Sequence, residues 1–143
     1  MAENIQLQWE HLVDLGMARL SAHNYCLEEL TDTEQELATL WRFEADVSNG
    51  GLVQFFCNWG PQSYDIARRA LRKIEADRAR EALEEFYSVI ERFQDDEKIK
   101  NLWDIAEFLN DKELEIITRL NKEYWENHLA EISVLAVNFY SAV

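Results

Sequence analysis

The chain has 143 residues, 48% of them hydrophobic, with four glycines, one proline and a net charge of −14. A chain of this length buries roughly 68–70% of its unfolded surface, so we expect one domain spanning residues 1–143. The charge argues against direct binding of nucleic acid or of an anionic membrane surface. No signal peptide and no apolar run long enough to cross a bilayer is found, so we expect a soluble, cytoplasmic protein.

Apolar residues at helical spacing predict helices along most of the chain. The first is expected over about residues 4–24, and its buried face is predicted to contain Leu7, Leu12, Leu15, Ala18 and Leu20, widened by Trp9 and Val13. Two overlapping capping boxes begin at Thr31 and Thr33, and either can start a second helix, which we place at residues 32–48. A short aromatic helix follows, and Gly60-Pro61 is expected to break it.

The second half of the chain continues the helical pattern. We expect helices over about residues 62–76 and 77–93, then a polar linker at residues 94–98. Helical spacing resumes at residues 102–109 and, after a break at Asn110-Asp111, from Leu114 to Tyr124. A last helix within residues 125–143 is apolar enough to be core or dimer interface. Nothing predicts a strand, so the expected fold is an all-α, single compact domain of about six to seven helices.

A sharp corner is predicted between the second helix and the aromatic helix. Asn49 and Gly50 tolerate the left-handed backbone that ends a helix, and Gly51 lets the chain reverse closely against itself. Gln54 and Asn58 lie one turn apart on the helix that follows. These residues are predicted to be a structural motif that fixes the corner.

Glu44 falls in the middle of the apolar stripe of the second helix. A buried carboxylate must be paired, hydrogen-bonded or protonated, because burying it bare costs several kcal/mol. We expect its partner to be Asn49, Gln54, Asn58 or an arginine of the next helix. Glu44 therefore belongs to the same structural motif, with a general base as the functional alternative.

Catalytic and metal-binding patterns are hard to find in the sequence. His11, His23 and His128 are far apart, and no His-Glu-x-x-His motif or Gly-rich phosphate loop is present. Neither Cys26 nor Cys57 has an adjacent base, and no serine sits in a nucleophile elbow. We therefore expect a protein that is not an enzyme and that needs no metal and no cofactor.

The charge is distributed unevenly along the chain. Residues 1–60 carry ten acids and two bases, and residues 81–143 carry fifteen acids and six bases. Residues 61–80 instead carry three acids and six bases, and these bases form what we call the basic island: Arg68, Arg69, Arg72, Lys73, Arg78 and Arg80. We expect the basic island to neutralise acids within the molecule or to contact an acidic patch of a second subunit.

Carboxylates recur at helical spacing in the C-terminal half. Asp104, Glu107, Asp111 and Glu115 follow steps of three, four and four, so a continuous helix would align them roughly 5–6 Å apart. A second row is predicted on the preceding long helix, and it consists of Glu81, Glu84, Glu91 and Asp95. Rows of carboxylates at such spacing can imitate the phosphates of a DNA duplex. The alternative is a solvated face that keeps the protein in solution.

The corner and the helix after it resemble the signature of a known family. The shared residues are Glu44, Val47, Asn49, Gly50, Gly51, Gln54, Phe56 and Asn58, followed by Ala70, Leu71 and Ile74. Over about residues 30–125 the chain is similar to a small bacterial domain family whose best-known members are DNA-mimic proteins. The resemblance implies an all-helical and often dimeric domain, with at least one member that binds a helix-turn-helix transcription factor in place of DNA.

The sequence and the resemblance together predict a non-catalytic acidic binding protein that forms a homodimer. Its carboxylate rows are expected to occupy the DNA-binding surface of a basic partner, such as a helix-turn-helix transcription factor. Two alternatives stay open. One is an immunity or antitoxin-type protein that inhibits a toxin or nuclease, and the other is a helical adaptor without a charge-specific partner.

Overall fold

Helices make up most of the chain in the computed structural model, which describes residues 2–141. They are α1 (Ala2–Ala22), α2 (Asp32–Gly50), α3 (Leu52–Lys73), α4 (Asp77–Ile90), α5 (Ile105–Phe108), α6 (Asp111–Glu123) and α7 (Leu129–Tyr140). Single 3-10 turns lie at Leu27–Glu29, Glu91–Phe93 and Leu102–Asp104. Residues 2–141 contain no strand, which confirms the all-α prediction.

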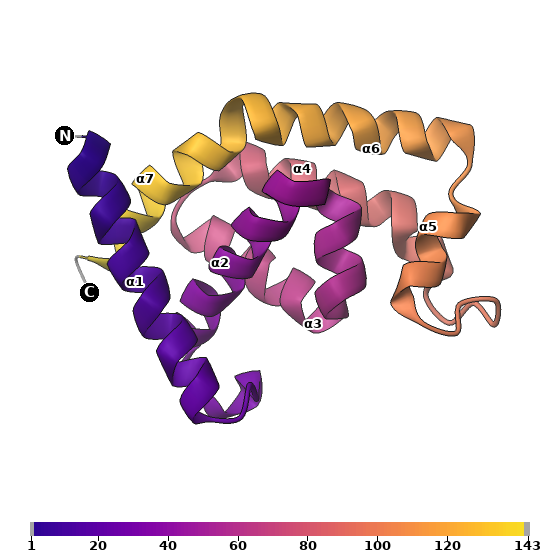
Figure 1. The fold of residues 1–143 in the computed structure, drawn as a ribbon. Helices are drawn as coiled ribbons and strands as arrows, with labels where there is room; N and C mark the ends of the chain where they lie inside the picture. The colour runs from indigo at the N-terminus through magenta and orange to yellow at the C-terminus, as the bar shows by residue number, and fades with distance from the viewer. Residues whose placement is uncertain (1, 142–143) are drawn as a thin grey trace.

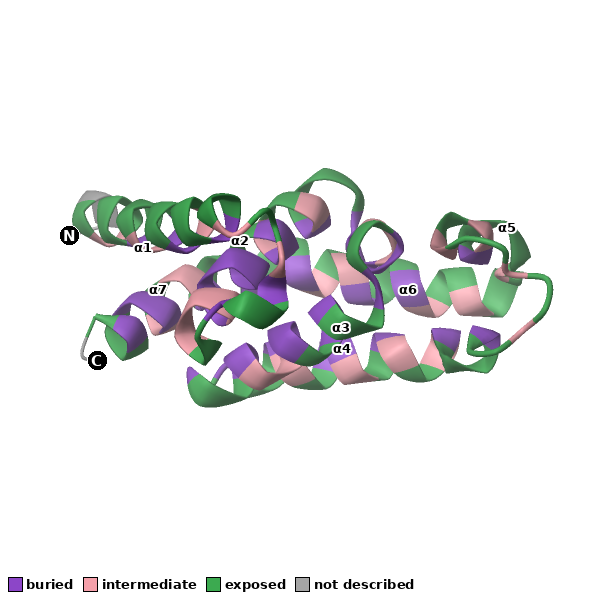
Figure 2. Cartoon of the chain, turned by 90° about the horizontal axis from the view of Figure 1, so that it is seen from below, coloured by how far each residue is buried: buried purple, intermediate pink, exposed green. Residues whose placement is uncertain are grey.

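The helices pack around α2 and α3, which lie in the middle of the molecule (Figure 1). α1 packs along α2 and α7, and both ends of the chain lie on that side. α4 runs alongside α3 and α6, and α5 lies at the opposite end of the molecule from the termini. Buried residues occupy the sides of these helices that face one another, whereas the outer sides are exposed (Figure 2).

The helix α1 turns a different stripe towards the core from the one predicted. Its buried positions follow steps of four, three and four, and they are Trp9, Val13, Gly16 and Leu20. Leu7 and Leu15 are instead 57% exposed. The reason is a close approach of α1 to α2, since a Cβ at Gly16 would lie 2.9 Å from the Cβ of Leu37. A leucine stripe centred elsewhere on α1 would hold the two helices apart.

The start of α2 uses the first of the two predicted capping boxes. The Thr31 Oγ1 accepts a hydrogen bond from the Glu34 backbone N–H at 3.2 Å, and the Glu34 carboxylate accepts one from the Thr31 N–H at 3.0 Å. These bonds satisfy two backbone donors that the helix itself leaves unpaired. Glu36, the acid of the second possible box, points into the protein instead.

The predicted break at Gly60-Pro61 is a kink within α3. Gly60 has φ of 81° and ψ of −169°, a conformation that strongly favours glycine, and the helix resumes at Pro61. The first half of α3 contributes Phe55 to the core, where its ring meets that of Phe43 edge to face at 4.9 Å between centroids. The ring of Tyr124 also packs edge to face against Phe43, at 5.4 Å between centroids.

The C-terminal helices α6 and α7 follow one another with a bend between them (Figure 1). Asn110 caps α6 by accepting a hydrogen bond from the Glu113 N–H at 2.8 Å, at the predicted break. α6 then passes into α7 through a π-helical turn, Tyr124–His128. Tyr124 in this turn is fully buried and donates its hydroxyl hydrogen to the Ala79 carbonyl of α4. None of the helices within residues 2–141 has the length and hydropathy needed to cross a membrane.

Candidate partner-binding surface

The corner between α2 and α3 depends on the backbone conformation of a single glycine, Gly51. Asn49 and Gly50 remain in α2, and the unusual backbone falls on Gly51, with φ of 97° and ψ of −172°. The Gly51 N–H bonds back to the carbonyls of Asp46 and Val47, each at 3.1 Å. The prediction that Asn49-Gly50 would take the left-handed conformation is therefore wrong by one or two residues, because α2 continues through Gly50.

The polar side chains of the corner converge on Asp46, a residue that was not predicted from the sequence to belong to the motif. Gln54 and Asn58 donate their amide N–H groups to the Asp46 Oδ1, at 3.0 and 3.3 Å. Trp59 donates its indole N–H to the Asp46 Oδ2 at 2.7 Å, and Asn49 bonds to Gln54 at 3.3 Å. An ionised carboxylate only accepts hydrogen bonds, so it is the natural centre for three donors. This network links the end of α2 to the first half of α3.

Glu44 lies outside that network, which corrects the prediction for its partner. Its Oε2 accepts a hydrogen bond from the Trp9 indole N–H of α1 at 2.9 Å. Residues two apart in a helix point about 200° apart, so Glu44 and Asp46 face nearly opposite sides of α2. Burial raises the pKa of the Glu44 carboxyl, and the bond from Trp9 partly offsets that rise.

We expect the variant Glu44→Gln to be more stable than the wild type at pH 7, by about 1 kcal/mol or less. An acid whose pKa is raised on folding weakens the folded state when it is ionised. The gain should shrink as the pH falls through the raised pKa of Glu44 and vanish below its ordinary value of 4.5. Urea unfolding of both proteins between pH 7 and pH 4 measures the difference. A variant less stable than the wild type at pH 7 would show that the bond to Trp9 outweighs burial.

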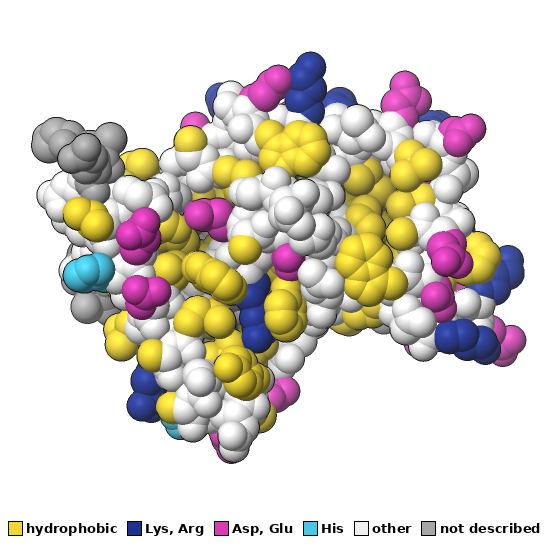
Figure 3. All heavy atoms as spheres, in the orientation of Figure 1, with side chains coloured by type: hydrophobic (Ala, Val, Ile, Leu, Met, Phe, Trp, Pro, Cys, Tyr) yellow, Lys and Arg dark blue, Asp and Glu magenta, His cyan; other side chains and the backbone are white. Residues whose placement is uncertain are grey.

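Three tryptophans surround the corner and keep their rings partly in solvent. Trp103 donates its indole N–H to the Asn58 Oδ1 at 3.1 Å, and Trp125 donates to the Val47 carbonyl at 2.6 Å. Together with Trp59 they are 40–52% exposed. Hydrophobic side chains accordingly gather across the middle of the face seen in Figure 3. The internal hydrogen bonds fix the orientation of these rings, so the corner carries an ordered aromatic surface.

The first predicted carboxylate row does not form as a single line. α5 ends at Phe108 and α6 begins at Asp111, so no continuous helix carries residues 104–115. The Asp104 carboxylate is bonded to the backbone: its Oδ2 accepts hydrogen bonds from the N–H groups of Lys100 and Asn101 at 2.8 and 3.1 Å. Glu107, Asp111 and Glu115 are exposed.

The second predicted row is also interrupted. α4 ends at Ile90, Glu91 starts a 3-10 turn, and Asp95 has a left-handed backbone with φ of 62°. Glu84 is neutralised by two cations of the basic island, Arg68 at 3.1 Å and Arg80 at 2.7 Å. The prediction of a straight row on one long helix is therefore wrong.

Most of the predicted partner-binding carboxylates nevertheless remain available. Within the described residues, six of the eight form no ion pair and are exposed: Glu81, Glu91, Asp95, Glu107, Asp111 and Glu115. Acidic side chains lie at the end of the molecule that carries α5, with basic side chains beside them (Figure 3). One nearby cation is already occupied, since the Arg92 guanidinium pairs with Glu113 at 2.7 Å.

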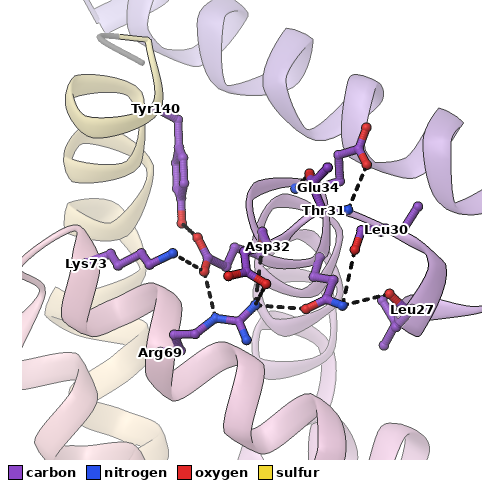
Figure 4. Close-up of polar contacts among 10 residues, drawn as sticks. Leu27, Leu30, Thr31, Asp32, Glu34, Arg69, Lys73 and Tyr140 are labelled. Atoms are coloured by element: carbon purple, nitrogen blue, oxygen red, sulfur yellow. Dashed lines mark hydrogen bonds and ion pairs between the residues drawn. The ribbon is translucent and has the colours of Figure 1, made fainter.

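A buried acid of α2 explains much of the basic island. Glu36 is fully buried, and its Oε2 lies 2.7 Å from both the Arg69 Nε and the Lys73 Nζ. Its other oxygen accepts the hydroxyl hydrogen of Tyr140 at 2.9 Å. Figure 4 shows Arg69 and Lys73 of α3 and Tyr140 of α7 converging on this carboxylate. The partners lie 33 to 104 residues from Glu36, so no local pattern pointed to the site.

The basic island thus acts largely within the molecule. Arg68, Arg69, Lys73 and Arg80 pair with Glu36 or Glu84, which is the internal neutralisation proposed from the sequence as one of two roles. Arg72 and Arg78 are exposed and form no ion pair within the described residues.

Neither cysteine has the surroundings of a nucleophile. Burial raises the pKa of the Cys57 thiol to about 11, and its Sγ donates to the Leu102 carbonyl at 3.2 Å. The hydrogen bond to Glu28 raises the pKa of Cys26. A reactive cysteine needs the opposite shift, towards the thiolate. Among the side chains that the structure describes, residues 4–141, no group of three or more His, Cys, Asp or Glu is arranged to hold a metal ion.

Within the described residues, the fold and the surface define a small acidic all-helical domain with exposed carboxylates that form no ion pair and with an ordered corner between α2 and α3. Residues 28–141 match the DMP19-like protein family, and the chain therefore belongs to that family. This confirms the resemblance at the level of the family and extends it beyond residue 125 through α7. Searches among curated proteins and solved structures find no match for the chain.

Proposed function

We propose that the protein is a non-catalytic DNA mimic whose exposed carboxylates occupy the DNA-binding surface of a basic partner protein. The observation that most directly supports the proposal is the set of six predicted carboxylates that are exposed and form no ion pair within the described residues, in a member of the DMP19-like family. Family membership supports this class of function, and the acids supply the charge that it needs. A helix-turn-helix transcription factor is the partner class that we favour.

The physical basis is the charge density that such a partner recognises. Duplex DNA carries about one negative charge per 1.7 Å of axis, and a DNA-binding protein meets it with lysines and arginines. Phosphate contacts set the position of the protein on DNA and carry no base information, so carboxylates can replace them. Contacts between exposed charges are screened by salt, so the binding that we propose weakens as salt increases. The proposal includes a cytoplasmic location, because the protein must meet a partner that binds DNA.

The first test is capture of the partner on the immobilised protein at low salt, followed by elution with rising salt. The captured protein is then bound to duplex DNA, and the purified chain is added as a competitor in a gel-shift assay. We expect the chain to displace the DNA, and we expect its own affinity for the captured protein to fall as salt rises. An affinity of the chain that does not change with salt would overturn the proposal, as would capture of a toxin that the chain inhibits without any effect of DNA.

We expect the triple variant Glu107→Gln, Asp111→Asn, Glu115→Gln to compete about tenfold less well, because exposed charge pairs contribute roughly 0.2–1 kcal/mol each. The matched control changes three exposed acids elsewhere: Asp14→Asn, Glu29→Gln, Asp65→Asn. Both variants lose three negative charges, so only a specific contact surface separates them. Equal effects of the two variants would mean that net charge alone drives the competition.

The proposal includes a homodimer, and α7 offers a surface for it. Val134 and Phe139 are exposed on this helix, and a shallow, mostly apolar groove is lined by Ala130, Glu131, Val134 and Leu135. Burial of such a patch against a second copy would remove apolar area from water. Light scattering of the purified chain tests this, with twice the 16.9 kDa of one chain as the expected mass.

A further inference from the structure

An apolar pocket of about 280 Å³ opens at the end of the molecule that carries α5. It is lined by α3 around its kink, the end of α4, the segment 91–99, the 3-10 turn at Leu102–Asp104 and the start of α5. Its buried lining includes Phe56, Ile90, Phe93 and Ile105. Its volume lies just below the roughly 300–1,000 Å³ typical of small-molecule sites, which suits one large side chain.

The rim of this pocket is acidic. Glu91 and Asp95 are exposed there, Asp96 is partly exposed, and no lysine or arginine is among the residues that line the pocket. Glu91 and Asp95 form no ion pair within the described part of the chain. The Asp96 Oδ1 accepts a hydrogen bond from the Lys98 backbone N–H at 2.9 Å, and Asp96 already lies near the positive charge of Arg92. Glu91 and Asp95 can therefore pair with a cation without displacing a partner.

We propose that this pocket binds an apolar side chain of the partner protein that is flanked by lysine or arginine. The apolar lining takes the side chain, and the carboxylates at the rim take the neighbouring cations. The inference rests on the proposed function, since Glu91 and Asp95 belong to the carboxylates assigned there to the partner.

The pocket gives the protein a contact that DNA does not offer. Charge alone cannot distinguish one basic protein from another, and cellular DNA presents a very large number of competing sites. An apolar anchor adds binding energy that salt does not screen, and it is specific for partners with the matching side chain. Salt should therefore reduce the affinity to a plateau that the pocket maintains.

The test uses three fluorescein-labelled synthetic helical peptides of equal length. The first carries lysines around one central leucine, the second has serine in place of the leucine, and the third has glutamine in place of the lysines. Fluorescence anisotropy measures their binding to the full chain. We expect the first peptide to bind about tenfold more tightly than the second, as burial of one apolar side chain predicts. It should also bind more tightly than the third.

Two variants locate the binding. Ile99→Trp fills the pocket from its lining, and Gln94→Trp does so from the exposed rim, so that one remains informative if the other fails to fold. If its circular dichroism spectrum matches that of the wild type, either variant should bind the leucine peptide no more tightly than the serine peptide. The double variant Glu91→Gln, Asp95→Asn should bind the first and second peptides, which both carry lysines, more weakly by a similar factor. It should still prefer the leucine peptide.

The inference is overturned if the wild type does not prefer the leucine peptide or if filling the pocket leaves the preference intact. It is also overturned if butylammonium alone displaces the peptide at equal concentration, since the pocket would then be a small-molecule site. Failure of the proposed function is distinguishable: the chain would then not displace DNA from the captured partner, whatever the peptides do. If DNA competes but Ile99→Trp and Gln94→Trp both bind the peptides as the wild type does, only the pocket assignment fails.

Discussion

The double variant Arg69→Met, Lys73→Met is expected to lower the free energy of unfolding by about 3–5 kcal/mol. Both cations lie 2.7 Å from the same oxygen of Glu36, whose side chain is fully buried. Without them the carboxylate keeps only the hydrogen bond from Tyr140 and cannot reach water. Urea unfolding at pH 7 measures the loss.

A third substitution separates this explanation from a general loss of packing. Adding Glu36→Gln to the double variant removes the stranded charge, and Gln can still accept the hydrogen bond from Tyr140. We therefore expect the triple variant to recover at least half of the lost stability. The matched control is Arg72→Met, Arg78→Met, which removes two exposed cations of the same basic island and should change stability by about 1 kcal/mol or less. Double and triple variants of equal stability would contradict the assignment of a buried ionised Glu36.

Glu36 also shows what a sequence can and cannot predict here. The bounds of the helices were predicted to within a few residues, because apolar spacing, the Thr31 capping box and the Asn110 break are all local signals. The sequence marked Glu36 only as the acid of the second possible capping box. Its burial depends on Arg69, Lys73 and Tyr140 from two other helices, and a single sequence does not state which helices meet.

The predicted surface was right in composition and wrong in arrangement. The spacing predicted Asp104 and Asp111 on one line, but they belong to two separately capped helical segments. Asp104 accepts a hydrogen bond from the Asn101 N–H at the start of a 3-10 turn, and Asp111 is the first residue of a new helix that Asn110 caps. The corner was located correctly, yet its centre, Asp46, was overlooked in favour of Glu44. A helix rotates by about 100° per residue, so a choice between two neighbouring acids needs knowledge of which side of α2 meets α1.

Gly51→Ala is expected to lower the free energy of unfolding by about 2–4 kcal/mol. Gly51 has φ of 97° and ψ of −172°, a region that residues with a Cβ rarely enter. An added Cβ would also lie 2.5 Å from the Asn121 Nδ2 of α6. Asn121 accepts a hydrogen bond from the Leu52 N–H at 2.9 Å and so caps the start of α3, which the clash would disturb.

Backbone strain and side-chain clash can be told apart with Asn121→Ala. Alone it should cost about 1 kcal/mol, the value of one hydrogen bond. Combined with Gly51→Ala it removes the clashing group, so the loss in the double variant should be smaller than the sum of the two single losses. Gly50→Ala, one residue earlier in helical backbone, serves as the comparison: it gains helix propensity but displaces the end of Gln54 and weakens its hydrogen bonds with Asp46 and Asn49, so its loss should be about 1 kcal/mol and smaller than that of Gly51→Ala. Equal losses for Gly50→Ala and Gly51→Ala would contradict the conclusion that the corner depends on the conformation of Gly51.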